Sequence, residues 1–125
     1  MDNNQQHDTF RVAFASSDGY VIDTHFGRAT SFYIYQYFDD EYVFVEKREL
    51  EPVCLGGSHS TTKMRENVAQ FQDCQYIVAL RIGMGAIAII QDSGITPMAI
   101  PGDITDVMEK LRQYHEIQNL FHSAL

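Results

Sequence analysis

Residues 75–100 read QYIVALRIGMGAIAIIQDSGITPMAI, and this stretch decides the fold because two apolar strands enclose a helical segment. Gln75 to Leu80 is a short apolar run, which is typical of a buried strand. Gly85 to Gln91 is expected to form a short helix, and Ile95 to Ile100 a second strand. Gly94 stands where a left-handed residue commonly ends a helix. The stretch therefore predicts a strand–helix–strand unit with parallel strands.

A final helix is expected directly after this unit. Asp103 can cap its first turn, because a carboxylate at that position accepts hydrogen bonds from free helix amides. The helical spacing of apolar residues predicts a buried stripe, which comprises Ile104, Val107, Met108 and Leu111. Beyond Tyr114 the rhythm continues through Ile117, Leu120 and Phe121, which can pack on the domain or on a partner.

Three further strands are expected before this unit. They comprise residues 10–15, 31–38 and 42–50, with Asp39-Asp40-Glu41 as the hairpin connection between the last two. A loop rich in glycine and serine follows, and apolar residues then recur at helical spacing over residues 61–72. This order implies an α/β fold, a mixed five-stranded sheet flanked by helices, with an antiparallel first half and a parallel second half.

The composition describes one acidic globular domain. The chain has 125 residues, of which 45% are hydrophobic, and a formal net charge of -8. A surface of that sign repels phosphate backbones and anionic lipid, which argues against binding to nucleic acid or to membranes. No apolar run reaches the length of a membrane span and no secretory signal is found, so we expect a cytoplasmic protein. The two cysteines form no disulfide framework and are expected to be reduced.

The first loop with possible chemistry holds His25, within the stretch Asp23-Thr24-His25-Phe26-Gly27. A histidine between a strand edge and a glycine can project its ring away from the core, where imidazole binds a metal or a proton. Two interpretations stay open, a histidine that only stabilises the turn and a ligand for iron or molybdenum. Asp23 is placed to orient the ring through a hydrogen bond, and Phe26 is expected to anchor the loop in the core.

The second loop reads Pro52-Val53-Cys54-Leu55-Gly56-Gly57-Ser58-His59. Cys54 lies beside paired glycines, a setting typical of an accessible thiol. Its separation from His59 does not match a zinc-finger spacing, and no second cysteine pair exists to complete a structural zinc site. The alternative is a flexible linker with an incidental cysteine. Cys74, at the end of an amphipathic helix, is expected to pack in the core.

The third loop begins at Arg81. The following stretch Gly83-Met84-Gly85-Ala86-Ile87-Ala88 formally matches a dinucleotide-binding fingerprint, but its helix is short and the chain lacks a second mononucleotide half. We expect instead that Gly83 and Gly85 form a glycine nest at a helix N-terminus that accepts an anion, with Arg81 adding positive charge. The alternative is a tight turn that requires glycine for its shape.

The three loops resemble, in the same order, motifs of the nitrogenase iron–molybdenum cofactor-binding family, the NifX-like proteins. The stretch from Asp18 to Gly27 is similar to the signature loop, and Cys54 with the glycines and His59 after it is similar to the next motif. Arg81-Ile82-Gly83 is similar to a segment found in NifX-like proteins and in the C-terminal domain of NifB. The resemblance spans residues 10–113 and implies a ribonuclease H-like fold.

Members of this family bind the iron–molybdenum cofactor or its iron–sulfur precursor transiently and pass it between nitrogenase cofactor-assembly proteins, without catalysis. The resemblance therefore implies that His25 and Cys54 are metal ligands. It also implies contacts to the cofactor from His59, Arg81, Gly83 and Gly85. A permanently held iron–sulfur cubane normally needs four thiolates, so this small donor set suits loose capture of a preassembled cluster.

The implied organisation is a disordered tail over residues 1–9, a cofactor-binding domain over 10–113 and a helical extension over 114–125. Two other functions stay open. One is a regulatory or metal-binding module of the same family that has no role in nitrogenase assembly. The other is a ribonuclease H-like nuclease, although the strands at 10–15 and 75–80 contain no Asp or Glu for two-metal hydrolysis.

Overall fold

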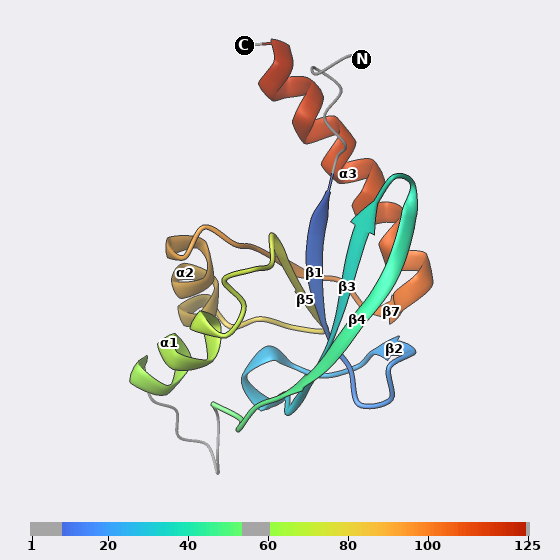
Figure 1. Cartoon of the computed structure of the whole chain (residues 1–125). Coiled ribbons are helices and arrows are strands. Elements are labelled where there is room, and N and C mark those ends of the chain that lie inside the picture. The colour runs from blue at the N-terminus through green and yellow to red at the C-terminus, as the bar shows by residue number, and fades with distance from the viewer. Residues whose placement is uncertain (1–8, 54–60, 125) are drawn as a thin grey trace.

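The computed structural model describes residues 9–53 and 61–124, and its centre is a mixed five-stranded sheet (Figure 1). The strands are β1 (Phe10–Ala15), β3 (Ser31–Phe38), β4 (Glu41–Glu49), β5 (Tyr76–Ala79) and β6 (Thr96–Ala99), in the spatial order β4-β3-β1-β5-β6. β3 is antiparallel to β1 and to β4, whereas β1, β5 and β6 are parallel. The predicted sheet, antiparallel in its first half and parallel in its second, is confirmed.

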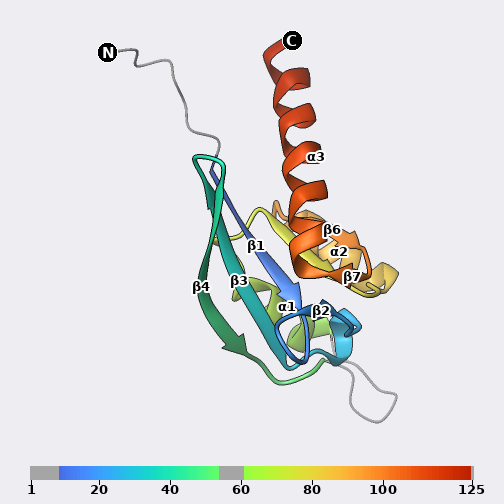
Figure 2. The same cartoon turned by 90° about the vertical axis from the view of Figure 1, so that its right-hand side faces the viewer.

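Helices cover both faces of the sheet. α1 (Thr61–Ala69) and α2 (Met84–Asp92) lie on one side, and α3 (Ile104–Ala124) lies on the other (Figures 1 and 2). The central strand β1 is apolar in both directions, as strands covered on both faces are. Its Ala13 and Ala15 belong to the core beneath α1 and α2, while Phe10, Val12 and Phe14 belong to the core beneath α3.

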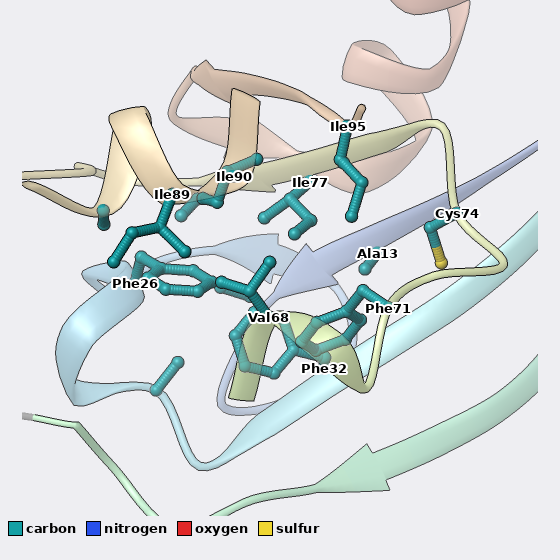
Figure 3. Packing of buried hydrophobic residues seen from close by; sticks show 14 of the residues in the cluster. Ala13, Phe26, Phe32, Val68, Phe71, Cys74, Ile77, Ile89, Ile90 and Ile95 are labelled. Atoms are coloured by element: carbon teal, nitrogen blue, oxygen red, sulfur yellow. The ribbon is translucent and has the colours of Figure 1, made fainter. Parts of the chain in front are cut away.

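The helix expected over residues 61–72 ends earlier, at Ala69. The backbone N–H of Phe71 donates to the carbonyl of Val68, three residues back, at 2.9 Å. Such a turn is tighter than an α-helix and rotates the chain. It directs the Phe71 ring into the core, 4.8 Å from the ring of Phe32 (Figure 3).

The end of α2 follows the sequence prediction. Gly94 is left-handed, with φ +82°. The N–H of Gly94 donates to the Gln91 carbonyl at 2.9 Å, and the N–H of Ile95 donates to the Ile90 carbonyl at 3.2 Å. These two bonds form a Schellman motif, which ends the helix and turns the chain into β6.

A two-stranded sheet that the sequence did not predict joins β2 (Val21–Ile22) to β7 (Gly102–Asp103). The pairing is antiparallel, and the N–H of Ile104 donates to the Tyr20 carbonyl beside it at 2.8 Å. Strands of two residues have no hydrophobic period to detect, so only the folded chain reveals them. The small sheet fastens the loop that leads to His25 against the start of α3.

α3 begins at Ile104, as expected, and continues without a break to Ala124, past the predicted boundary at residue 113. The predicted stripe of Ile104, Val107, Met108 and Leu111 is buried. Ile117, Leu120 and Phe121 are exposed and do not pack on the domain, because the end of α3 extends beyond the sheet (Figure 2). Within the described part of the chain, no helix has both the length and the apolar character that a membrane span requires.

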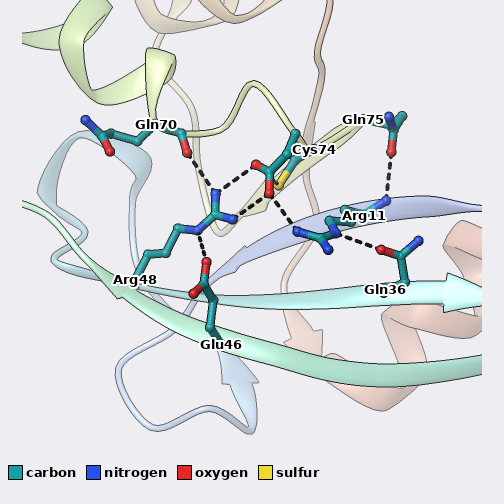
Figure 4. Close-up of polar contacts among 8 residues, drawn as sticks. Arg11, Gln36, Glu46, Arg48, Gln70, Cys74 and Gln75 are labelled. Atoms are coloured by element: carbon teal, nitrogen blue, oxygen red, sulfur yellow. Dashed lines mark hydrogen bonds and ion pairs between the residues drawn. The ribbon is translucent and has the colours of Figure 1, made fainter.

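Two arginines share one carboxylate at the edge of the core (Figure 4). Arg48 Nη2 on β4 lies 2.6 Å from Asp73 Oδ2, and Arg11 Nη1 on β1 lies 2.9 Å from the same oxygen. Arg48 also donates to Glu46 and to the Gln70 carbonyl. The hydrogen bonds from Arg48 hold the pKa of Asp73 well below its usual range. This arginine cluster ties two strands of the sheet to the loop before β5.

Candidate functional site

A cavity of about 780 Å³ lies beside the carboxyl end of β5, the edge of an α/β sheet at which ligands commonly bind. The connecting segments line it with His25, Gly27, Arg28, Arg81, Ile82 and Gly83. The helices α1 and α2 line it with Thr61, Met64, Met84, Gly85, Ala86 and Ile89. Four residues that the sequence singled out in two separate loops, His25, Arg81, Gly83 and Gly85, therefore share one cavity.

Backbone hydrogen bonds hold the His25 loop against the Arg81 loop. His25 and Arg81 form a parallel bridge. The N–H of Phe26 donates to the Arg81 carbonyl at 2.9 Å, and the N–H of Leu80 donates to the Thr24 carbonyl at 3.0 Å. The buried ring of Phe26 anchors the loop in the core, as predicted (Figure 3). The two candidate loops are therefore positioned by backbone contacts rather than by their exposed side chains.

His25 is exposed and lines the cavity. Asp23 does not orient the imidazole ring of His25, contrary to the prediction. Asp23 Oδ1 accepts hydrogen bonds from the Ser17 backbone N–H at 3.0 Å and from the Thr24 hydroxyl at 2.8 Å, while Oδ2 accepts from the Ser17 hydroxyl. Partial burial disfavours its charge, yet the bonds from Ser17 and Thr24 keep the pKa of Asp23 below its usual value. Asp23 therefore stabilises the fold of the loop, and the prediction that it orients the His25 ring is wrong.

The glycines at the start of α2 leave the cavity wall open. Gly83 has φ -67° and ψ 159°, and Gly85 lies within the helix, so neither backbone conformation requires glycine. A Cβ at either position would meet no atom within 4 Å. The alternative prediction, a turn that requires glycine, is therefore wrong, and the N–H donors expected from the glycine nest are the free amides of the first turn of α2.

The charge of the cavity is opposite to that of the chain. Arg28 and Arg81 line it, and none of the described lining residues is Asp or Glu, although the net charge of the protein is -8. Among the described residues, no carboxylate forms an ion pair with Arg28 or Arg81. The N-terminus of α2 adds the positive end of its dipole. This local field favours an anionic ligand.

Sequence reasoning missed Arg28 as well as the two methionines of the lining, Met64 and Met84. Arg28 is the last residue of the 3-10 turn Phe26–Arg28. Its backbone N–H donates to the His25 carbonyl at 3.1 Å. Its position directly after the signature stretch was the available signal. The methionines offered none, because Met64 follows the pattern of a core helix and Met84 reads as a surface residue.

Cys54 and His59 lie outside the described residues, so their predicted roles stay predictions. Thr61, the first described residue after them, lines the cavity, and Val53 before them is buried in the core. In the described part of the chain, no group of three or more His, Cys, Asp or Glu side chains is arranged to hold a metal ion. The clustered carboxylates of a two-metal nuclease are therefore not found there.

Cys74 packs in the core, as expected. Its side chain is buried against residues such as Phe71 and Ile77. Burial raises the pKa of the thiol to about 12, and the nearby carboxylate of Asp73 adds to this shift. A thiol with so high a pKa stays protonated at neutral pH and is a poor metal ligand.

Comparisons with known proteins show the family of the chain. The model of the family described as "Dinitrogenase iron-molybdenum cofactor" matches residues 9–114. The FeMo cofactor biosynthesis protein NifB of Klebsiella pneumoniae is 33% identical over 101 residues, which cover 75% of this chain and 21% of that protein. Protein NifY of Azotobacter vinelandii is 32% identical over 98 residues, which cover 78% of this chain and 39% of that protein.

The similarity also holds at the level of fold. The crystal structure of PH0822 superposes with a TM-score of 0.62 at 23% sequence identity, over 81% of this chain and 88% of that one. At this identity, the superposition supports the fold alone. The chain spans about a fifth of the length of the NifB proteins that it matches.

Proposed function

The chain belongs to the dinitrogenase iron-molybdenum cofactor family, and from this premise we propose that it carries that cofactor or its iron–sulfur precursor. In this proposal the cluster is cargo, which the protein receives from one assembly protein and releases to another without catalysing a reaction. The matching relatives NifB and NifY support the assignment to cofactor biosynthesis. The family premise likewise leads us to propose a ribonuclease H-like fold, supported by a sheet in which β3 alone is reversed.

The observation that carries the proposal is the cationic cavity beside β5. A chain with a net charge of -8 repels anions, so an anionic cluster needs a local site of the opposite sign. Arg28, Arg81 and the uncovered first turn of α2 meet at such a site, and the described residues of its lining include no carboxylate. The volume of about 780 Å³ lies within the range of small-molecule sites.

We assign the metal contact to His25, because neutral imidazole is a suitable ligand for iron and it lines the cavity. Cys54 is proposed as the second ligand and His59 as a further contact, supported by the place of the neighbouring Thr61 in the lining. Arg81 and the amides at Gly83 and Gly85 contact the charged surface of the cargo. One or two protein ligands give the loose attachment that a carrier needs for release.

The proposal is tested by loading the anaerobic protein with isolated iron–molybdenum cofactor and measuring the iron that co-elutes on gel filtration. His25→Ala and Cys54→Ala are each expected to lower iron retention. For His25→Ala the melting temperature should stay nearly unchanged, because substitution of an exposed side chain usually alters stability by less than about 0.5 kcal/mol.

Cys74→Ala is the matched control. It removes a buried thiol from the core, so it should lower the melting temperature and keep the iron. Recovery of iron-free wild-type protein from excess intact cofactor and from excess precursor would rule out the carrier. The protein would then fit the alternative of a family module with no role in nitrogenase assembly.

A further inference from the structure

The cavity presents two chemically different kinds of group. His25 supplies an imidazole, which suits a metal ion. Arg28 and Arg81 supply guanidinium groups, whose rigid forks of N–H donors match the oxygens of carboxylates and of tetrahedral oxyanions. The sulfides of an iron–sulfur cluster accept single N–H hydrogen bonds, but they do not offer the paired oxygens that a guanidinium fork matches. A bare cluster therefore uses the hydrogen-bonding capacity of the arginines only in part.

Three other arginines are engaged by carboxylates within the molecule, whereas the exposed Arg65 on α1 forms no ion pair among the described residues. Arg11 and Arg48 bind Asp73, and Arg112 binds Glu109 and Glu116. Arg28 and Arg81 form no ion pair among the described residues, although the chain has almost twice as many acidic as basic residues, 17 against 9. Two unpaired arginines that line one cavity are available to an outside anion.

We infer that Arg28 and Arg81 form an oxyanion subsite, which binds a carboxylate or oxo group independently of the metal contact at His25. This inference rests on the proposed function and specifies its cargo. A cluster that carries a carboxylate or an oxo group offers the arginines paired oxygens to bind, whereas a bare iron–sulfur cluster offers them only its charged surface. The cavity thus selects the oxygen-bearing form of the cargo.

The positions of the two arginines are fixed by the backbone. The N–H of Phe26 binds the carbonyl of Arg81 itself at 2.9 Å, and Arg28 ends the short turn that begins with Phe26. The two side chains therefore start from backbone positions that are held together, although both side chains are exposed and must be ordered by the ligand.

The experiment titrates the full-length, metal-free protein with citrate and, separately, with molybdate at constant ionic strength, followed by amide NMR. Saturable shifts of Gly27, Gly83 and Gly85 are expected, with chloride giving none. Saturation by citrate alone identifies a carboxylate ligand, and saturation by molybdate alone identifies an oxometallate.

Arg28→Gln and Arg81→Gln should each lower the affinity for the anion at least about tenfold, because each removes a charge-assisted hydrogen bond. Lys110→Gln, which removes one positive charge from α3 on the other face of the sheet, should leave the affinity unchanged. The NMR spectrum itself reports whether each variant is folded. An unchanged affinity in both arginine variants would overturn the subsite.

Parallel loading with isolated iron–molybdenum cofactor separates this inference from the carrier proposal. If the cofactor loads and neither citrate nor molybdate saturates the protein, the subsite is wrong and the carrier proposal stands. If the anions bind through the arginines and neither the cofactor nor its precursor loads, the carrier proposal fails, and the subsite survives as a site for small oxyanions.

Discussion

Arg11 and Arg48 lie around Asp73 at the edge of the core, whereas Arg28 and Arg81 line a cavity whose wall, as far as the structure describes it, contains no acidic side chain. The first pair is satisfied within the molecule, by a shared carboxylate and, for Arg48, by a carbonyl group as well. The second pair is held in place through its backbone and keeps its charge for a ligand. Paired arginines join elements of a fold, and unpaired arginines in a cavity indicate what the cavity binds.

The largest expected effect comes from reversing charge in the cavity. Arg81→Glu should reduce retention of the iron–molybdenum cofactor by about 100-fold or more, because a lost charge-assisted hydrogen bond is joined by repulsion of an anion. The measurement is iron retained after anaerobic gel filtration at a series of protein concentrations. Lys110→Glu, the same reversal on α3, should retain cofactor as the wild type does. Equal loss in both variants would show that net charge, and not the cavity, controls binding.

The second effect concerns stability. Arg48→Ala should lower the free energy of unfolding by about 2 kcal/mol, because it removes charged hydrogen bonds to Asp73 and Glu46 from a mostly buried side chain. Chemical denaturation measures this change. Arg28→Ala, at an exposed position, should change the same quantity by less than about 0.5 kcal/mol. If the two variants were equally destabilised, the contrast between the pairs would be lost.

Acid should weaken the Arg48 cluster and leave the cavity arginines charged. The pKa of Asp73 is lower in the folded protein than its ordinary value of 3.8, so folding is stabilised by its charge above that pH. This stabilisation is lost as the pH falls below about 4 toward the folded pKa. Urea denaturation between pH 5 and pH 2, in about unit steps, should show a steeper loss in the wild type than in Asp73→Asn. Parallel curves would mean that Asp73 contributes no pH dependence.

The smallest effect separates stability from binding at a single atom. Gly85→Ala should raise the free energy of unfolding by about 0.4–1 kcal/mol, because alanine favours the helix and the added methyl group meets no protein atom. The same methyl group enters the cavity wall, so cofactor retention should fall. Thermal unfolding of this variant should show the gain in stability, and iron retention should show the loss of cofactor binding. Unchanged retention would show that the cargo does not approach the first turn of α2.

Most of the fold could be predicted from the sequence because the patterns that determine its strands and helices lie within short stretches of the chain. Long apolar strands such as β1 and β3 carry a pattern that the sequence displays directly, and Gly94 marks a helix end for a conformational reason. The pairing of Val21 with Asp103 was not readable, since it joins two very short segments that are far apart in the chain. The early end of α1 accompanies the packing of the Phe71 ring against Phe32 in the core, a tertiary contact that the local sequence does not indicate.

The candidate site was readable in part for the same reason. His25, Arg81, Gly83 and Gly85 stand beside turn signals, so their loops were identified from sequence and the structure brings them to one cavity. Arg28 was missed because its place depends on how the His25 loop folds against Arg81. The expected contact between Asp23 and His25 was wrong, since Ser17 offers Asp23 both a hydroxyl and a backbone donor.

The central claim is that the cargo binds in the cavity beside β5, and amide NMR of the protein loaded with the iron-containing cofactor tests it most directly. The NMR signals of amides near bound iron should shift or broaden, and we expect these amides to be those of Gly27, Gly83, Gly85 and Ala86. The amide signals of α3 and β4 should keep their positions. A second cavity of about 350 Å³, lined in part by Tyr35, Tyr42 and Met108, provides the internal alternative. Changes centred on that second cavity, with the amides of Gly83 and Gly85 unaffected, would contradict the account.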